Sequence, residues 1–480
     1  MTTPSEPVEA SIAPVVRAGA LSFARIAPLY LRDPIDFFEK IHARFGPTVM
    51  FERPTGGLRR THPLLITSDP VLVRQLLLDR HCRSSALTLQ GPKGSAQRRL
   101  RRGLFRMHGR PHREHRVLVG PALQKRAVEG YHGVMMQGVE SVLGRWKAGE
   151  VRDVAPDMKS MGRLVASLAL FGHRDAEEST RIGEMAEDWA SDSWRLLPNL
   201  LSFDSPGLPY RRMLKKADRL ERVILEVIER KRAEGLADDD LLTRLIRANA
   251  DDWGLTDAQL VGHANILFLA ANETTANSLT WTLYLLAQHP DLASRVCAEI
   301  DAVLGGDPPQ AEQLEKLELL DRVIRESLRL IPIVPYGARV AEAPVDLPEL
   351  HLPRKSRVLI PYHVMHHDPT IFPRPNRFDP DRWIGFEPPP YSYLPFSAGP
   401  HVCIGIAFAQ HTMRLALTMI LRRFRFSVVS GSRVDRRVTV TVAARPGLPM
   451  RILPADGRFE RVVVRGDVLR MVDLDDERHS

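Results

Sequence analysis

The chain has 480 residues, 44% of them hydrophobic and 26% charged, a composition typical of a soluble globular protein with a large buried core. Its formal net charge is +9, but the basic residues are spread along helical stretches, and the densest cluster, Arg98-Arg99-Leu100-Arg101-Arg102, has no aromatic neighbours. We therefore expect an acidic protein partner and no nucleic acid. Cys82, Cys297 and Cys403 are too scattered for a disulfide framework, which indicates a reducing cytoplasm.

The N-terminal segment, residues 1–33, is interrupted by prolines and arginines, so it has no apolar span of transmembrane length. We expect this segment to be partly flexible and the protein to have no membrane span. The interval 82–106 has no clean period and is predicted to be a loop with a short helix. Before it, the pattern predicts a helix at 34–45, strands at 48–51 and 63–67 on either side of a Gly56-Gly57 turn, and a helix at 71–78.

His112 and Arg116 are four residues apart at the start of the next helical run, so they lie on one face of a helix. Taken alone, such a pair is most often exposed to solvent. Three further helices are predicted at 158–171, 178–194 and 209–234, with a loop at 196–209 that is rich in proline and leucine.

A capping-box pattern at 256–259 predicts the start of a long helix, which ends before Pro290. Its length of roughly 50 Å is enough to cross a whole molecule. Near its middle, Glu273 and Thr274 interrupt an apolar stretch. A buried carboxylate is costly unless it is paired or used, so the two residues are either a hydrogen-bonded pair that relieves a kink or a reactive pair.

Glu326 and Arg329 are three residues apart on the next helix and can form an ion pair. Arg339 follows in an extended segment, and a strand is predicted at 358–362. His363, His366 and His367 suggest zinc, but the sequence offers no tetrahedral ligand set with the usual spacing. Two Pro-x-Arg-aromatic patterns follow, one containing Arg377 and the other Arg382.

The last motif is a loop that contains Phe396, Gly399, Cys403 and Gly405, followed by a helix predicted at 406–422. A cysteine just before a helix start feels the helix dipole and unpaired N–H groups, which favour the thiolate, the form that binds iron. The alternative is a small buried hydrophobic residue. After this helix we predict strands at 425–429 and 438–443 and a turn at 446–449.

The pattern Phe-x-x-Gly-x-x-x-Cys-x-Gly resembles the haem-binding loop of the cytochrome P450 family. His401 stands where that family usually has arginine, which weakens the contact to a haem propionate. Residues 270–275 resemble the oxygen-binding helix, with Ala271 in place of a glycine, so that one methyl group narrows the groove for dioxygen and water. The order of all the motifs between His112 and Gly405 is that of the family.

This resemblance implies a mainly α fold with small β-sheets, a triangular helical prism around a buried haem. It implies one haem domain at 34–454 and an extension of unknown role at 455–480. Haem b would be ligated by Cys403, and Glu326, Arg329 and Arg382 would form a structural clamp, with Arg382 preferred to Arg377 by its distance from Cys403. Further cofactor contacts would come from His112, Arg116, Arg339, His401, Phe396, Gly399, Gly405, Ala270 and Ala271.

The resemblance further implies a monooxygenase in which Glu273 and Thr274 relay protons to dioxygen. Electrons would come from NAD(P)H through a separate reductase and a ferredoxin or flavodoxin. We expect a cytoplasmic monomer and a hydrophobic substrate of lipid, terpenoid, steroid or polyketide type. Peroxide-using enzymes and non-catalytic haem-thiolate sensors are the alternatives, and the acid and alcohol argue against the first. The expected pocket residues are Leu267, Ala270, Ile333, Val334 and Leu448.

Overall fold

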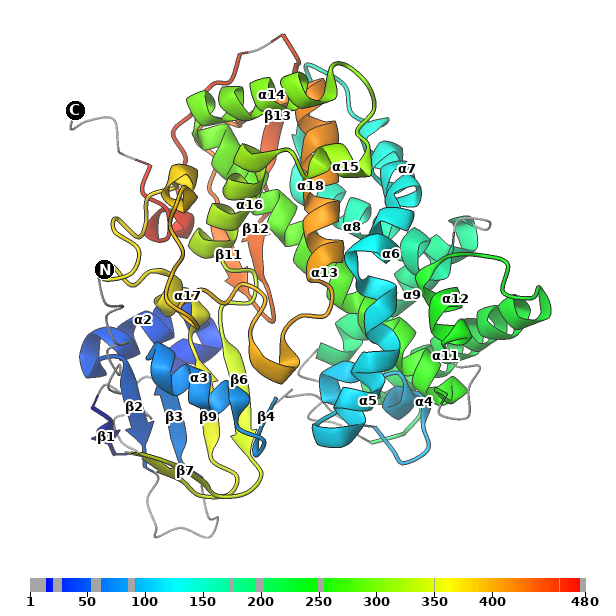
Figure 1. Ribbon diagram of the computed structural model, residues 1–480, viewed down its shortest axis with the longest axis vertical. Coiled ribbons are helices and arrows are strands. Elements are labelled where there is room, and N and C mark those ends of the chain that lie inside the picture. Colours follow the sequence, from blue (N-terminus) through cyan, green and yellow to red (C-terminus); the bar gives the residue numbers. More distant parts are fainter. Residues whose placement is uncertain are drawn as a thin grey trace, which may run out of the picture. The chain divides into compact units, whose positions relative to one another are not determined.

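The computed structural model describes residues 14–19, 28–52, 62–84, 91–172, 176–194, 203–248, 254–348, 350–456 and 458–474. These residues form two compact units (Figure 1), the first from residues 1–85, 334–376 and 385–402 and the second from residues 86–333, 377–384 and 403–480. The predicted Gly56-Gly57 turn and part of the loop at 196–209 lie outside the described residues. The chain is mainly α with small sheets, as the sequence predicts.

The first unit is built on a six-stranded mixed sheet with the order β1-β2-β3-β9-β6-β4. Strand β1 belongs to the N-terminal segment and pairs in parallel with β2, so at least this part of the segment is fixed to the sheet. The strand bounds are β1 (Val16–Ala18), β2 (Thr48–Phe51), β3 (Leu64–Thr67), β4 (Cys82–Ser84), β6 (Gly337–Ala341) and β9 (Arg357–Ile360), with a small hairpin of β7 (Val345–Leu347) and β8 (Leu350–Leu352).

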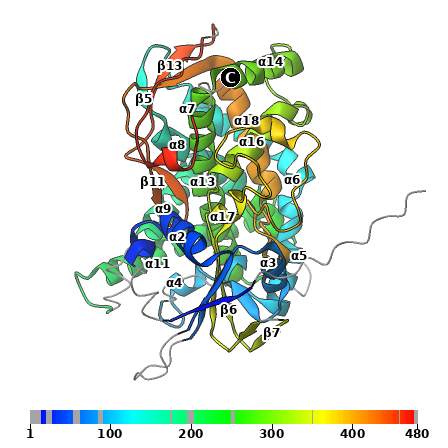
Figure 2. The same ribbon diagram turned by 90° about the vertical axis from the view of Figure 1, so that its left-hand side faces the viewer.

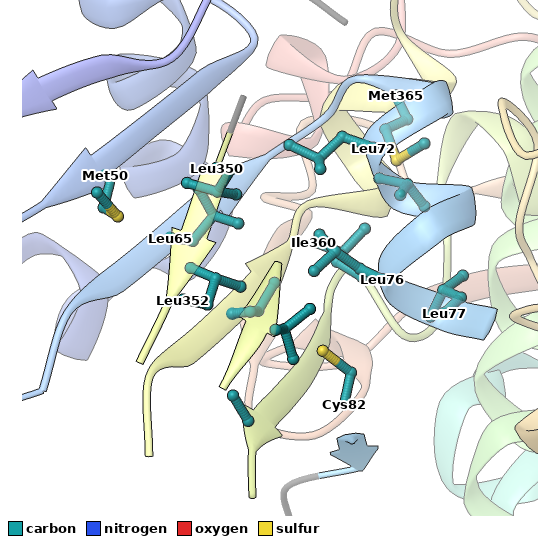
Figure 3. Close-up of a cluster of buried hydrophobic side chains, with 14 of the residues drawn as sticks. Met50, Leu65, Leu72, Leu76, Leu77, Cys82, Leu350, Leu352, Ile360 and Met365 are labelled. Atoms are coloured by element: carbon teal, nitrogen blue, oxygen red, sulfur yellow. The ribbon is translucent and has the colours of Figure 1, made fainter. Parts of the chain in front are cut away.

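Helix α3 (Pro70–Leu78) covers one face of this sheet, and its apolar spacing explains why. Figure 3 shows Leu72, Leu76 and Leu77 of α3 directed toward the strands, and all three are buried. They belong to one hydrophobic cluster with Leu65 of β3 and Ile360 of β9. Among the described residues, the unit also contains α2 (Pro34–Phe45), α17 (Tyr362–His366) and the 3-10 turn η4 (Gly399–His401). Tyr362, predicted at a strand end, instead starts α17 because Pro361 ends β9.

The second unit is organised around α13 (Asp257–Gln288), the predicted long helix. Its capping box at Thr256 and Gln259 is present, and most of its length is buried. It packs against α8, α9, α11, α16 and α18, and Figure 2 shows α13 among these helices. The helix bounds are α4 (Ala96–Arg99), α5 (Gly109–Val119), α6 (Lys125–Gly130), α7 (His132–Leu143), α8 (Val154–Phe171), α9 (Ala176–Trp194), α11 (Pro209–Ala233), α12 (Leu241–Arg247), α14 (Pro290–Leu304), α15 (Ala311–Leu314), α16 (Glu318–Leu330) and α18 (Ile406–Arg423), with 3-10 turns η1 (Leu104–Arg106), η2 (Gly120–Leu123) and η3 (Pro380–Trp383).

Two small sheets complete the second unit. One contains β10 (Phe424–Val428), β13 (Pro449–Pro454) and β5 (Val151–Asp153), and the other is the hairpin of β11 (Asp435–Val438) and β12 (Val442–Arg445). The strand predicted at 438–443 is therefore wrong, because the chain reverses at residues 439–441. This turn contains neither glycine nor proline, and a pattern of β-branched residues conceals it. Strand β4 and the turn η1, within the predicted loop at 82–106, were also missed.

Residues 458–474, which the sequence places in an extension of unknown role, are packed into the second unit. The Val434 N–H donates to the Arg465 carbonyl at 2.7 Å, and Arg377 pairs with Asp473 as an isolated parallel bridge. Gly466 has φ +126°, and a Cβ there would clash with the Val434 carbonyl oxygen, so this position requires glycine. The stretch contains η5 (Asp467–Arg470) and buries Val464, Val468, Met471 and Val472.

Candidate active site

Cys403 precedes the first turn of α18 in the second unit, as the sequence predicts. Its side chain has an exposed face, but protein surrounds the sulfur on its other sides. That burial raises the pKa of the Cys403 thiol, while a hydrogen bond from the Gly405 N–H and the charge of Arg116 act to lower it. The Gly405 N–H at the helix start thus favours the thiolate, as the sequence predicts, but desolvation of the sulfur outweighs it. A metal cation at the sulfur would supply the missing stabilisation.

His112 and Arg116 both lie on α5, one turn apart. Burial, followed by the charges of Arg116 and His115, lowers the pKa of His112, so this imidazole is neutral at pH 7 and can donate only one N–H. Burial also lowers the pKa of Arg116, and the nearby Cys403 acts in the opposite direction. The guanidinium is therefore close enough to Cys403 for their charges to interact.

Four of the other predicted cofactor contacts, Arg339, Phe396, Gly399 and His401, lie in the first unit. Arg339 is on β6, is 6% exposed and donates through Nη1 to the Ala338 carbonyl at 3.0 Å. Phe396 is half-buried, and His401 ends the η4 turn that precedes Cys403. Gly399 has φ +73°, and a Cβ there would meet the Leu77 carbonyl at 2.9 Å, so glycine is needed to pack this loop against α3.

A stripe of exposed and half-buried residues runs along α13, which is otherwise mostly buried. Leu267, Ala270, Glu273, Thr274 and Asn277 recur at intervals of three and four, so they share one face of the helix. The predicted acid and alcohol thus lie on the open face of the helix that organises this unit. Ala271 is half-buried at the edge of the stripe.

The hydroxyl of Thr274 and the carboxylate of Glu273 have different partners. Thr274 donates to the Ala270 carbonyl at 2.6 Å, one helical turn back. Glu273 accepts at 2.7 Å from the hydroxyl of Thr441, and that hydroxyl accepts from Asn277 Nδ2 at 3.1 Å. Sequence reasoning missed Thr441 and Asn277. No sequence signal could have found Thr441, which lies in the misassigned β11–β12 turn.

The three residues of the predicted clamp come together in the second unit. Glu326 accepts from Arg329 Nη2 at 2.8 Å and from Arg382 Nε at 2.9 Å. Glu326 and Arg329 have no exposed surface. Trp383 Nε1 and the Asp379 N–H also donate to Glu326. The competing Arg377 contributes its carbonyl oxygen, which accepts from Arg329 Nη2 at 3.1 Å.

The expected pocket residues differ in accessibility. Leu267 is half-buried and Ala270 is exposed, so both can contact a ligand from α13. Val334 is 36% exposed and Ile333 only 6%. Leu448 has no exposed surface, and its N–H donates to Asp153 Oδ1. Protein atoms therefore cover both Leu448 and Ile333, and their assignment to a substrate pocket stays a prediction.

The histidine cluster of the first unit does not suit zinc. His363 Nε2 lies 3.0 Å from Glu39 Oε1, and His366 Nε2 accepts from the Leu394 N–H at 2.8 Å. Throughout the described ranges, no three side chains of histidine, cysteine, aspartate or glutamate are arranged to hold a metal ion. The histidines instead fasten α17 to its neighbours.

The residues of Cys403 and α5 suit a haem. An exposed sulfur whose pKa is raised can become a thiolate by binding iron, and the basic residues of α5 can face carboxylates such as the propionates. The apolar face at Leu267 and Ala270 could border a flat macrocycle. A cysteine sulfur that can bind iron, with basic residues nearby for the propionates, is typical of haem-thiolate proteins.

A protein-family comparison agrees with this class. The family model described as cytochrome P450 matches residues 25–451. The chain belongs to the cytochrome P450 family, and it is a P450 monooxygenase. Among the described residues, no helix combines the length and the apolar character needed to cross a membrane.

Three curated relatives cover between 76% and 95% of the chain. Cyclooctatin synthase of Streptomyces melanosporofaciens is 31% identical over 95% of this chain and 98% of its own. Pentalenene oxygenase of Streptomyces avermitilis is 28% identical over 90% of this chain and 96% of its own. Cyclooctat-9-en-7-ol 5-monooxygenase of Streptomyces melanosporofaciens is 31% identical over 76% and 81%.

Solved structures support the fold. A retinoic acid-bound cyanobacterial P450 superposes with a TM-score of 0.77 at 24% identity, over 89% of this chain and 96% of its own. The haem domain of cytochrome P450DA superposes with a TM-score of 0.78 at 23% identity, over 94% and 99%. At these identities the likeness establishes the P450 fold alone.

Proposed function

We propose that the protein inserts one oxygen atom of dioxygen into a hydrophobic small molecule, by hydroxylation or epoxidation. The second oxygen atom leaves as water, and the reaction takes up two electrons and two protons. One observation carries the proposal: an acid and an alcohol lie on the open face of α13, in the same unit as an exposed cysteine that suits iron. Proton uptake needs groups of this kind within hydrogen-bond reach of the reacting oxygen.

Haem b would be held through the Cys403 sulfur, with its carboxylates facing His112, Arg116, Arg339 and His401. Phe396, Gly399 and Gly405 would shape the loop around it, and Ala270 and Ala271 would border it from α13. When bound, the haem supplies the iron at which dioxygen is activated. Because burial raises the pKa of the Cys403 thiol, iron would have to displace the thiol proton in order to bind the sulfur.

Thr274 would deliver a hydrogen bond to the reacting oxygen. Its hydroxyl donates to the Ala270 carbonyl. Rotation about one side-chain torsion would break this bond and let the hydroxyl donate to another acceptor. Its lone pairs can accept from water in either position. Glu273 would pass protons from solvent, since one carboxylate oxygen is held by Thr441 while the side chain stays exposed.

Glu326, Arg329 and Arg382 would act as a structural clamp. Glu326 and Arg329 have no exposed surface, the Arg382 side chain is only 9% exposed, and the carboxylate of Glu326 binds both guanidinium groups. Such a group suits the fixing of chain segments far apart in the sequence better than proton exchange with solvent.

The substrate proposal rests on apolar surface and on the names of relatives. Leu267 and Ala270 offer only hydrocarbon to a ligand on the open face of α13. Cyclooctat-9-en-7-ol and pentalenene, named for two of the relatives, are by nomenclature an unsaturated alcohol and an alkene. We therefore place a terpenoid or steroid hydrocarbon skeleton ahead of lipid and polyketide substrates that carry more oxygen.

Electrons would come from NAD(P)H through a reductase and a separate ferredoxin or flavodoxin. The net charge of +9 supports an acidic carrier. A cytoplasmic monomer is the matching expectation, and the carrier would dock through an interface small enough for rapid exchange.

The spectrum of the purified protein tests the cofactor, and turnover tests the reaction. We expect a red-shifted Soret band when the haem is reduced under carbon monoxide, and its loss in Cys403→Ser. With a surrogate ferredoxin and reductase, we expect oxidised pentalenene to form, and other members of a terpenoid and steroid panel to shift the haem spectrum. A parent protein without the red-shifted band overturns the thiolate assignment.

Two further outcomes separate the alternative functions. Product formation from hydrogen peroxide but not from dioxygen and reductase identifies a peroxide-using enzyme. Dioxygen consumption without product, for every compound that shifts the haem spectrum, identifies a sensor and overturns the monooxygenase proposal.

A further inference from the structure

We propose that Thr441 is a positioning residue for the monooxygenase reaction, which holds the carboxylate of Glu273 in place on the open face of α13. The inference deepens the proposed function, because it rests on the role of Glu273 in proton delivery. It also assigns a role to the β11–β12 turn, which is 168 residues away from Glu273 in the sequence.

The hydrogen bonds have a single consistent direction. The Thr441 hydroxyl lies 2.7 Å from Glu273 Oε1, and Asn277 Nδ2 lies 3.1 Å from the same hydroxyl. A hydroxyl has one proton to donate, and an ionised carboxylate can only accept. Asn277 therefore donates to Thr441, and Thr441 donates to Glu273. The amide thus orients the hydroxyl that holds the acid.

The backbone of the turn is held from two sides. The Val442 N–H donates to the Ile333 carbonyl at 2.9 Å. The Val442 carbonyl accepts from Trp281 Nε1 at 2.9 Å. Trp281 is 1% exposed and lies two turns beyond Glu273 on α13. Thr441 is itself only 3% exposed. The hydroxyl is therefore presented from a buried and fixed position.

Glu273 needs such a partner because its own side chain is exposed. An exposed glutamate explores several rotamers, and each change moves the carboxylate by several ångströms. Within the described residues, the Thr441 hydroxyl is the one hydrogen-bond donor to this carboxylate. With Oε1 held, the second oxygen stays at one place on the open face, where it can exchange protons with water.

The matched test replaces the hydroxyl by a methyl group at two neighbouring positions. Thr441→Val removes the donor and keeps the shape, and Thr441→Ser restores the donor. Thr439→Val makes the same chemical change in the same turn, at an exposed side chain for which the described structure gives no hydrogen bond. Glu273→Gln is combined with Thr441→Val to complete a double-mutant cycle.

Each holoenzyme is assayed with a surrogate ferredoxin, its reductase and pentalenene as the probe. The readout is the ratio of hydrogen peroxide to water formed from the dioxygen consumed, which is measurable whether or not pentalenene is oxidised. Late proton delivery lets both atoms of dioxygen leave as peroxide with two electrons and two protons. Thermal unfolding and the pentalenene-induced change of the haem spectrum are recorded for each variant as readouts other than turnover.

We expect Thr441→Val to raise the ratio of peroxide to water by about two- to tenfold, the range that corresponds to one lost hydrogen bond. Thr441→Ser and Thr439→Val should stay within about twofold of the parent protein. In the Glu273→Gln background, Thr441→Val should leave the ratio unchanged. The amide of glutamine cannot exchange protons as a carboxylate does, so holding it in place no longer affects proton delivery. Thermal unfolding and the spectral response of Thr441→Val should match those of Thr439→Val.

The failures are distinguishable. If Glu273→Gln changes the ratio and Thr441→Val does not, the positioning role of Thr441 is wrong and the proposed function stands. If Glu273→Gln leaves the ratio unchanged, the proton-delivery role of Glu273 fails, and the inference fails with it. Equal effects of Thr441→Val with and without Glu273→Gln would assign Thr441 a general structural role.

Discussion

Glu326 and Glu273 are two glutamates of the same unit with opposite surroundings. Glu326 has no exposed surface and accepts hydrogen bonds from Arg329, Arg382, Trp383 and the Asp379 backbone. Glu273 is exposed and accepts from one hydroxyl, that of Thr441. The first carboxylate is saturated with donors, and the second keeps room for water.

The difference separates structural from chemical use of the same side chain. A buried carboxylate is stable only when donors and opposite charges compensate its charge. These same partners keep the carboxylate ionised, so it does not exchange protons. An exposed carboxylate costs little to ionise and can exchange protons, but it lacks a fixed position. The fold supplies that position to Glu273 through the β11–β12 turn. Variants at the two sites should therefore affect different measurements.

The largest effect is expected for Glu326→Gln, which removes the charge and turns an amide group toward arginine and tryptophan donors. Two buried guanidinium groups lose their counter-charge, so we expect the unfolding free energy to fall by about 3–5 kcal/mol. Urea unfolding and the haem content of the purified protein measure the effect. Glu318→Gln, on the exposed face of the same helix, should change stability by less than about 0.5 kcal/mol. Equal losses for both variants would contradict a clamp.

A smaller effect on stability, but a clear one on turnover, is expected for Thr274→Val. Loss of the hydroxyl should raise the ratio of hydrogen peroxide to product about tenfold or more, because proton delivery to the reacting oxygen is impaired. Thr280→Val is the matched control, since Thr280 makes the same kind of bond to the Ala276 carbonyl at 2.8 Å but is buried. A comparable change in Thr280→Val would show that the bond along the helix matters, and not the hydroxyl on the open face.

The smallest effect is expected for Ala271→Gly, which restores the residue usual in the family. Glycine inside a helix costs about 0.5–1 kcal/mol relative to alanine, so thermal unfolding should begin at a slightly lower temperature. The yield of product per dioxygen consumed measures how the loss of the methyl group affects turnover. An unchanged yield would show that the methyl group does not narrow the groove enough to matter. An improved yield would show that it does.

The sequence predicts the helical framework well because helix signals are local. The capping box at Thr256 and the proline at position 290 predict the ends of α13 to within one residue. Helix α18 begins at Ile406, as the sequence predicts. The contact of Arg382 with Glu326 follows from the family resemblance. Periodicity alone would not have distinguished Arg382 from Arg377, because both follow a proline by two residues.

The parts that the sequence could not predict depend on distant contacts. The β11–β12 turn has no residue that requires a positive φ, and its place depends on the hydrogen bonds of the Val442 backbone with Ile333 and Trp281. The raised pKa of the Cys403 thiol depends on how much protein surrounds the sulfur. The hydrogen bond from the Leu448 N–H to Asp153 likewise joins residues that are far apart in the sequence.

The stretch at 458–474 has a consequence for protein engineering. The family match stops at residue 451, and a designer who trims a gene to that match would delete the apolar side chains of Val464, Val468 and Met471. The deletion would also remove Asp473, which pairs with Arg377 beside the clamp. A reductase fused directly after Pro454 would replace the packed stretch at 458–474. A reductase joined beyond Asp473 through a flexible linker would leave that stretch intact.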